Sequence, residues 1–332
     1  MSGPPAAGRS CAVADRSDLG RLIAKGPDLL GLLHRLSTGD VKDLRPGEGR
    51  ETVITTAKGR IVERLFVHHL GGDGVLLVTG PGGAPRVLAH LQRFTFAEVT
   101  GLSDATAATF AFALLGPRWA EAARAVGIPE LAPYGASALT IAGTPVHAAR
   151  TNGYDANGVL VIGPDSGTES VRAALVEAGA EGAGMLEADM LESWRVANGL
   201  PASGHELTED YNPLEAGLNG AVSFSKGCYV GQEVIARLNT YRKVSRGLVR
   251  LEFEAGAPVP APGASIMKDG NTIGVVTSAV RPRGGRGAVA LGYVKLRDIS
   301  AATTTLTVDD GGTSQSSVSR WIAVDAARAS RS

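Results

Sequence analysis

The chain has 332 residues, enough for a substantial buried core and for more than one structural unit. Its 33 Lys and Arg residues balance 33 Asp and Glu residues, so the global charge gives no support for binding nucleic acid or an anionic membrane. Two cysteines, Cys11 and Cys228, exclude a disulfide framework and favour a reducing cytoplasm, and no apolar run reaches the roughly 18 residues of a membrane span.

The first 17 residues carry two arginines among Ala, Gly and Pro, without the continuous apolar segment of a secretory signal. We expect residues 1–17 to form a disordered leader in which Cys11 has no function. The ordered chain is predicted to begin at Asp18. Asp28 then caps a short helix over 29–36, in which leucines recur at three- and four-residue steps.

Strands and helices are predicted to alternate through the middle of the chain. Apolar runs predict strands over 51–56, 61–67, 74–78 and 158–162, and helical periodicity predicts helices over 119–126, 169–178 and 185–198. This alternation is typical of an α+β or α/β arrangement. From 247 to 322 the chain instead shows short apolar runs separated by Gly, Pro and Asp-Gly turns, which is typical of a small β-barrel or sandwich.

The stretch Lys-Gly-Cys-Tyr-Val-Gly-Gln-Glu, from Lys226 to Glu233, places Cys228 between a lysine and a glycine-rich turn before a predicted helix over 232–238. A neighbouring ammonium and helix-terminal N–H groups both stabilise a thiolate, so this composition is typical of a reactive thiol. A lone cysteine is also a common small hydrophobe of protein cores. Composition by itself leaves both interpretations open.

The octapeptide, with Ser223-Phe224-Ser225 before it and Ala236-Arg237 after it, resembles the signature of the YgfZ family. These folate-binding proteins are implicated in iron–sulfur cluster maturation and are relatives of the glycine-cleavage T-protein aminomethyltransferase. Further segments that look like landmarks of the shared architecture are 36–41, 58–60, 199–201, 212–215 and 274–278. The resemblance covers about residues 18–322.

The resemblance implies a multi-subdomain α+β fold: a T-protein-like ring of subdomains around a folate cavity over 18–243, a C-terminal β-barrel over 244–324 and a tail over 325–332. The implied ligand is tetrahydrofolate or a derivative. The implied partners are iron–sulfur client or assembly proteins. With the composition, it predicts a soluble cytoplasmic protein that binds neither nucleic acid nor membrane.

The chain departs from the T-protein branch at three places. That branch relies on an aspartate after an Asn-Ala turn, which should fall around 79–86, where no carboxylate is present. Ala156 stands where that branch has the glutamate of a Thr-Gly-Glu segment, and Arg195 is followed by Val-Ala instead of Leu-Glu. A carboxylate pairs with the N–H donors of a pterin, so these departures argue against aminomethyl transfer. Asp155 and Asp189 are candidates to compensate.

Cys228 and Lys226 are the predicted chemical residues. The ammonium of Lys226 either stabilises the thiolate or meets an anionic folate tail, and the alternative is an ordinary solvated lysine. A stable iron–sulfur cluster usually needs about four cysteine or equivalent ligands, so we predict no stably bound cluster. Transient ligation of iron or a cluster shared with a partner, redox exchange and nucleophilic catalysis remain. We favour the first two, because the octapeptide contains no histidine base and His205 is the nearest upstream.

The residues predicted to bind folate are Gly227, Tyr229, Gly231, Gln232, Glu233, Arg237, Trp194 and Arg195. Packing is the alternative role for Tyr229 and Trp194. A favourable charge in the first turn of a helix is the alternative for Glu233, and a surface ion pair is the alternative for Arg237. No metal site is predicted, because the histidines lack clustered partners.

We therefore expect a folate-binding, YgfZ-like protein that supports assembly or repair of iron–sulfur clusters in client enzymes through Cys228, without turnover of its own. The alternative is a tetrahydrofolate-dependent aminomethyl or methyl transferase of the T-protein type. A third hypothesis is a folate-binding module that acts only as a scaffold for partners.

Overall fold

The computed structural model describes residues 11–152, 157–179, 185–285, 287–299, 305–309 and 315–324. Contacts within the chain divide these residues into two compact units. The N-terminal unit comprises the described chain up to Glu187 together with Gly220–Gln232, and the barrel unit comprises Ala188–Asn219 and the described chain from Glu233 onward. None of the described helices combines the length and the apolar character needed to cross a membrane.

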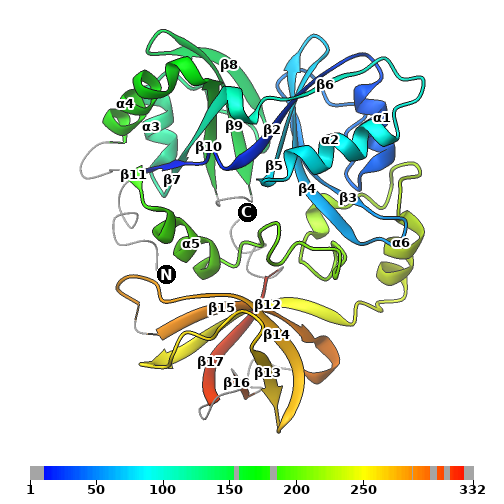
Figure 1. Ribbon diagram of the computed structural model, residues 1–332, viewed down its shortest axis with the longest axis vertical. Helices are drawn as coiled ribbons and strands as arrows, with labels where there is room; N and C mark the ends of the chain where they lie inside the picture. The colour runs from blue at the N-terminus through cyan, green and yellow to red at the C-terminus, as the bar shows by residue number, and fades with distance from the viewer. Residues whose placement is uncertain are drawn as a thin grey trace. The chain divides into compact units, whose positions relative to one another are not determined.

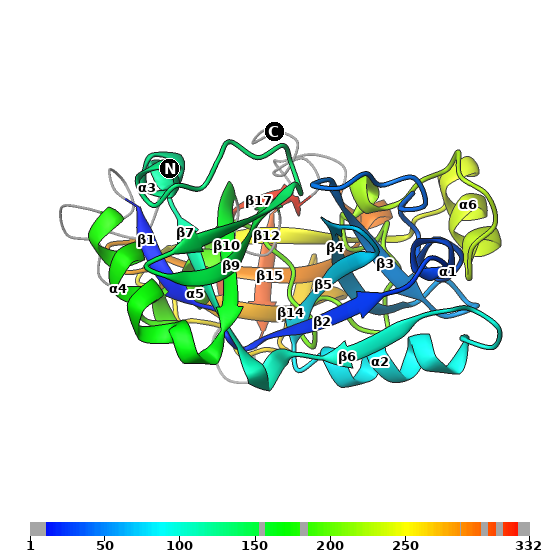
Figure 2. The same ribbon diagram turned by 90° about the horizontal axis from the view of Figure 1, so that it is seen from above.

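One sheet of the N-terminal unit is five-stranded and antiparallel, with helices on one face (Figures 1 and 2). Its strands in spatial order are β3 (Gly49–Thr55), β4 (Ile61–Gly71), β5 (Gly74–Pro81), β2 (Leu19–Lys25) and β6 (Gly101–Asp104). Leucines of α1 (Leu29–Leu36) and apolar residues of α2 (Ala84–Arg93) pack on this sheet. The strands predicted over 51–56, 61–67 and 74–78 and the helix over 29–36 lie here.

The other sheet of this unit is six-stranded and holds the second core (Figure 2). Its strands in spatial order are β11 (Met185–Leu186), β1 (Ala12–Asp15), β7 (Thr109–Leu115), β10 (Asn157–Pro164), β9 (Thr144–Asn152) and β8 (Ala136–Ile141). Helices α3 (Trp119–Ala125) and α4 (Thr168–Ala178) pack against it, and 3-10 turns η1 (Thr106–Ala108) and η2 (Asp165–Gly167) precede β7 and α4. Phe110 and Phe112 stack at its centre, with ring centroids 5.0 Å apart.

Two sequence predictions are wrong in this sheet, and both errors concern the same pair of strands. The leader expected over 1–17 includes β1, because Val13 and Ala14 pair in parallel with Met185 and Leu186 and antiparallel with β7. The helix expected over 185–198 consequently starts later, as α5 (Ala188–Ala197). The pairing joins segments more than 150 residues apart, so local periodicity does not reveal it. Residues 1–10 lie outside the described part of the chain.

The barrel unit contains a closed six-stranded barrel, as the sequence predicts (Figure 1). Its strands in spatial order are β12 (Arg246–Ala255), β15 (Gly287–Lys295), β14 (Asn271–Val280), β13 (Ser265–Lys268), β16 (Leu306–Asp309) and β17 (Gln315–Ala323). The 3-10 turn η4 (Leu296–Asp298) follows β15, and α5 also belongs to this unit. The resemblance instead predicts that residues 188–219 belong to the ring domain over 18–243.

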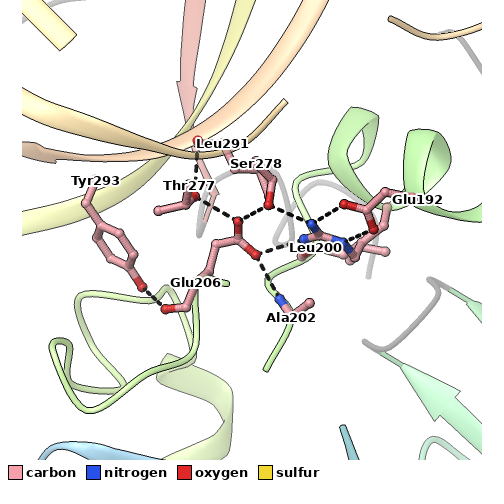
Figure 3. Close-up of polar contacts among 9 residues, drawn as sticks. Glu192, Leu200, Ala202, Glu206, Thr277, Ser278, Leu291 and Tyr293 are labelled. Atoms are coloured by element: carbon pink, nitrogen blue, oxygen red, sulfur yellow. Dashed lines mark hydrogen bonds and ion pairs between the residues drawn. The ribbon is translucent and has the colours of Figure 1, made fainter. Parts of the chain in front are cut away.

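Glu206 explains why residues 188–219 group with the barrel (Figure 3). Its buried carboxylate accepts hydrogen bonds from Thr277 Oγ1 (2.7 Å), Ser278 Oγ (2.6 Å), Arg195 Nη1 (2.8 Å) and the Ala202 backbone N–H (3.0 Å). Tyr293 of β15 donates its hydroxyl to the Glu206 carbonyl at 2.8 Å. One carboxylate therefore joins α5, the loop after it and strand β14.

Candidate functional site

The Cys228 loop, defined here as residues 222–231, lies between η3 (Asn219–Ala221) and α6 (Gln232–Thr240). Cys228 is exposed, whereas Cys11 at the start of β1 is buried. Burial raises the pKa of the Cys11 thiol to about 11, although a hydrogen bond with the Leu115 backbone opposes this shift. The accessible thiol is therefore that of Cys228, and the interpretation of this residue as a buried hydrophobe is wrong.

Lys226 buries its ammonium against the C-terminal end of α1. Nζ donates to the carbonyl oxygens of His34 (2.6 Å), Ser37 (2.7 Å) and Gly39 (2.6 Å). An ammonium has three N–H donors, so these three carbonyls use all of them. The last carbonyls of a helix lack partners within the helix and carry partial negative charge, so a cation is a favourable cap there.

This arrangement differs from both roles that the sequence suggests for Lys226. No N–H of its ammonium is left to donate to a thiolate or to an anionic folate tail, and the side chain is buried instead of solvated. The ring of Tyr229 covers Nζ, with 5.0 Å between Nζ and the ring centroid. Burial lowers the pKa of Lys226 to about 8, and the charge of Asp40 opposes the shift. In the structure Lys226 is an anchor.

Gly231 closes the other end of the Cys228 loop against the turn after β3. Its φ is +85°, and a Cβ on Gly231 would lie 2.6 Å from the Thr56 carbonyl oxygen and 2.8 Å from Thr55 Oγ1. Thr55 Oγ1 in turn donates to the Val230 carbonyl at 2.7 Å. Only glycine satisfies both the left-handed backbone and this close approach.

The other residues of the motif divide between exposed and buried positions. Gly227 is exposed, with nothing within 4 Å of an added Cβ. Tyr229 is buried, its hydroxyl has no hydrogen-bond partner among the described residues, and burial raises its pKa to about 12. Gln232 is half-buried and donates its N–H to the Tyr229 carbonyl at 3.2 Å. Glu233 and Arg237 are exposed on α6 and belong to the barrel unit, whereas the loop belongs to the N-terminal unit.

Trp194 and Arg195 also belong to the barrel unit, on α5. Arg195 uses all five N–H donors of its guanidinium: Nε and Nη2 bind Glu192 (2.7 and 2.6 Å), Nη2 binds Ser278 Oγ (2.8 Å), and Nη1 binds the Leu200 carbonyl (2.7 Å) and Glu206 (2.8 Å) (Figure 3). A pterin would have to displace one of these partners. Trp194 is half-buried, and its carbonyl accepts Asn198 Nδ2 at 2.7 Å.

The residues that hold the Cys228 loop, namely Ser37, Gly39 and Thr55, are not recognisable as such from the sequence. Segments 36–41 and 58–60 resemble family landmarks, yet nothing in the sequence shows that they contact the loop. The structure gives these landmarks a physical role, because the first supplies carbonyls to Lys226 and the turn at the second lies against Gly231.

A carboxylate from another strand lies beside the segment 79–86, which has none of its own. The segment 79–86 spans the end of β5 and the start of α2, and Glu63 of β4 lies beside it. Glu63 is buried, it pairs with Arg86 at 2.5 Å, and its Oε2 would lie 2.6 Å from a Cβ on Gly83. Asp155 and Ala156 lie outside the described residues, and Asp189 lies in the first turn of α5.

Two of the described histidines each lie close to a single polar group. His34 Nδ1 lies 3.3 Å from Asp40, and His68 Nδ1 lies 2.8 Å from the Tyr134 carbonyl. Burial lowers the pKa of His68 to about 4. Within the described ranges, no group of three or more His, Cys, Asp or Glu side chains is arranged to hold a metal ion.

Comparison with known proteins gives matches along most of the chain. The model of the GCVT N-terminal domain matches residues 6–226, and the model of the glycine cleavage T-protein C-terminal barrel domain matches residues 246–320. The chain is 31% identical over 302 residues to a putative chloroplastic transferase of Arabidopsis thaliana, covering 90% of this chain and 68% of that protein. It is 30% identical over 292 residues to an aminomethyltransferase of Thermus thermophilus, covering 86% and 80%.

A solved structure shares the fold. The glycine cleavage system aminomethyltransferase T of Bartonella henselae superposes with a TM-score of 0.81, covering 93% of this chain and 84% of that one at 23% identity. The superposition extends over both the sheets and the barrel, since it covers nearly the whole chain.

Proposed function

The chain belongs to the glycine cleavage T-protein (GCVT) family, and we propose that it is a folate-binding member of the YgfZ type, which supports assembly or repair of iron–sulfur clusters in client enzymes. The observation that carries this proposal is the exposed thiol of Cys228 on a loop anchored at both ends. Lys226 fixes the loop to α1, and Gly231 fixes it to the turn after β3.

An anchored, exposed thiol suits encounters with partner proteins. Holding a loop in one conformation costs about 1–2 kcal/mol of backbone entropy per residue, so the contacts around Cys228 must offset that cost. They present a sulfur at the surface, where a second protein can reach it. A purely packing role for the motif gives no reason for Cys228 to be exposed.

Two chemistries fit one accessible thiol. As a thiolate, Cys228 would ligate an iron of a cluster in transit while the partner protein supplies the remaining ligands. In redox exchange, the thiolate would attack one sulfur of a partner's disulfide, forming a mixed disulfide and releasing the other sulfur as a thiolate. Both need a partner, which we propose to be an iron–sulfur client or assembly protein.

The proposed ligand is tetrahydrofolate or a derivative, supported by membership of the family and by relatives named as aminomethyltransferases. A carboxylate is the natural partner of the adjacent N–H donors of a pterin. Glu63 offers one beside segment 79–86, where a pterin would have to share it with Arg86 and the Arg64 backbone N–H, which already bind its two oxygens. Arg195 is a poor candidate, because its donors are already engaged.

Calorimetric titration with reduced folates tests the ligand. We expect saturable binding to the wild-type protein, equal binding to Cys228→Ser, and weaker binding to Glu63→Gln. Absence of binding to the wild type would contradict the ligand assignment, and unchanged binding to Glu63→Gln would contradict the role of that carboxylate.

The second candidate function is a tetrahydrofolate-dependent aminomethyl or methyl transferase. The observation in its favour is the 30% identity to the Thermus thermophilus aminomethyltransferase along 86% of the chain. Incubation with tetrahydrofolate and an aminomethylated carrier protein separates the two functions. We expect no turnover above the rate without protein, and turnover at many cycles per molecule would favour the transferase.

A further inference from the structure

We propose that Lys226 is a positioning residue, whose ammonium fixes the Cys228 loop to the C-terminal end of α1 and thereby sets where the thiol is presented. The inference rests on the proposed function, in which Cys228 is the chemical centre. Lys226 itself acts only through the position of the loop.

The first support is the match between donors and acceptors. The three N–H donors of Lys226 bind three main-chain carbonyls at 2.6 to 2.7 Å. Hydrogen bonds from a charged donor are roughly twice as strong as neutral ones. Because the acceptors are main-chain atoms, the ammonium is tied to the path of the backbone through 34–39.

The second support is that the acceptor segment is itself held in place. Ser37 Oγ donates to the Leu33 carbonyl at 2.7 Å, and the Gly39 N–H donates to Thr52 Oγ1 at 2.6 Å. Thr38 Oγ1 donates to the Ala221 carbonyl at 2.6 Å, just before the loop begins. Lys226 is therefore bound to a fixed platform on the five-stranded sheet.

The third support is the short connection to the thiol. Two residues of extended chain span at most about 7 Å, so a displacement of Lys226 moves Cys228 with it. Tyr229, on the other side of Cys228, lies with its ring over the same ammonium. Residues on both sides of the thiol thus depend on one buried charge.

Lys226→Met tests the anchor, because it keeps an apolar stem and removes the charge and all three donors. We expect amide hydrogen exchange in 222–230 and 36–39 to accelerate at least tenfold, the factor that corresponds to losing about 1.4 kcal/mol. The matched control is Lys25→Met, an exposed lysine at the end of β2, for which exchange in both segments should stay unchanged. Exchange at wild-type rates in Lys226→Met would overturn the inference.

Rescue by a small cation separates anchoring from packing. Lys226→Ala removes the side chain beyond Cβ, and propylammonium supplies the missing carbons and the three donors. We expect propylammonium to restore slow exchange in 222–230, whereas 1-propanol should not. Equal protection by the two compounds, or by neither, would overturn the role of the charge. Should Met or Ala at 226 prevent folding, Lys226→Gln is the second variant, with exchange expected to be faster than in the wild type.

Functional complementation keeps this inference distinct from the proposed function. If Cys228→Ser supports client enzymes as well as the wild type, the proposed function fails whatever Lys226 does. If Cys228 is required but Lys226→Met supports full client activity with wild-type exchange rates, only the positioning role fails. We expect Lys226→Met to reduce client activity at least severalfold while its single accessible thiol is retained.

Discussion

Gly227 and Gly231 flank Cys228, yet the structure constrains only one of them. Gly231 has a φ of +85° and lies against Thr55 and Thr56, while Gly227 faces open space. The shared residue type therefore reflects two different physical situations, which the octapeptide as a sequence does not distinguish.

Alanine substitutions should separate these two glycines. Gly231→Ala places a Cβ 2.6 Å from a carbonyl oxygen in a left-handed backbone, and we expect a loss of about 1–3 kcal/mol in the free energy of unfolding. Gly227→Ala should change that free energy very little. Urea unfolding of both variants measures the difference, and equal losses would contradict the assignment of Gly231 as the constrained position.

The two cysteines should differ as sharply in reactivity. At pH 7.5, an aromatic disulfide reagent should label one thiol of the native protein rapidly and the second only on unfolding, because Cys11 is buried and its pKa is raised to about 11. Cys228→Ser should abolish the rapid phase, and Cys11→Ala should retain it. Rapid labelling of Cys228→Ser would show that Cys11 is accessible after all.

At the scale of elements, strand β4 carries a buried imidazole that makes stability depend on pH. The folded protein takes up a proton on His68 at a pKa of about 4, whereas an unperturbed histidine does so at 6.5. Between these values the unfolded chain binds more protons, so the free energy of unfolding falls as the pH is lowered through that window. The contribution lost reaches about 3 kcal/mol.

Urea unfolding between pH 7.5 and 4.5 tests this prediction. The free energy of unfolding of the wild type should fall with decreasing pH, and His68→Gln should show a shallower fall. Parallel pH profiles for the two proteins would mean that other groups dominate the acid response.

The attachment of α5 to strand β14 should depend on Glu206. Glu206→Gln removes the charge opposite Arg195 in a buried site, and we expect a loss of about 3–5 kcal/mol in the free energy of unfolding. Glu169→Gln removes the partner of Arg172 on an exposed helix and serves as the control, with little change expected. Similar losses in the two variants would contradict the central role of Glu206.

For the molecule as a whole, local patterns in the sequence were sufficient for strands β3, β4, β5 and β10 and for helix 29–36, and they reduced the C-terminal part to a barrel or a sandwich. Features that join distant segments were not predictable in this way. The pairing of β1 with β11 is one example, and the anchor of Lys226 is another, because its acceptors lie 187 to 192 residues earlier in the chain. The proximity of Lys226 to Cys228 in the sequence suggested that the ammonium contacts the thiol. Its long, flexible side chain instead reaches the C-terminal end of α1.

Membership of the GCVT family determines the fold, whereas the chemistry depends on the residues of the site. Three of the segments that resemble family landmarks hold other residues in place. Main-chain carbonyls of 36–41 bind Lys226, the Leu200 carbonyl binds Arg195, and the hydroxyls of Thr277 and Ser278 bind Glu206. Cys228 is different, because it is exposed and none of these contacts depends on its sulfur. The thiol is therefore where we propose that this chain acts.

The most direct test of that claim is complementation of a strain that lacks this protein, read as the activity of an iron–sulfur enzyme per amount of client protein. We expect Cys11→Ala to restore activity like the wild type, and Cys228→Ser, expressed and folded to the same level, to restore little or none. Full restoration by Cys228→Ser would contradict the account.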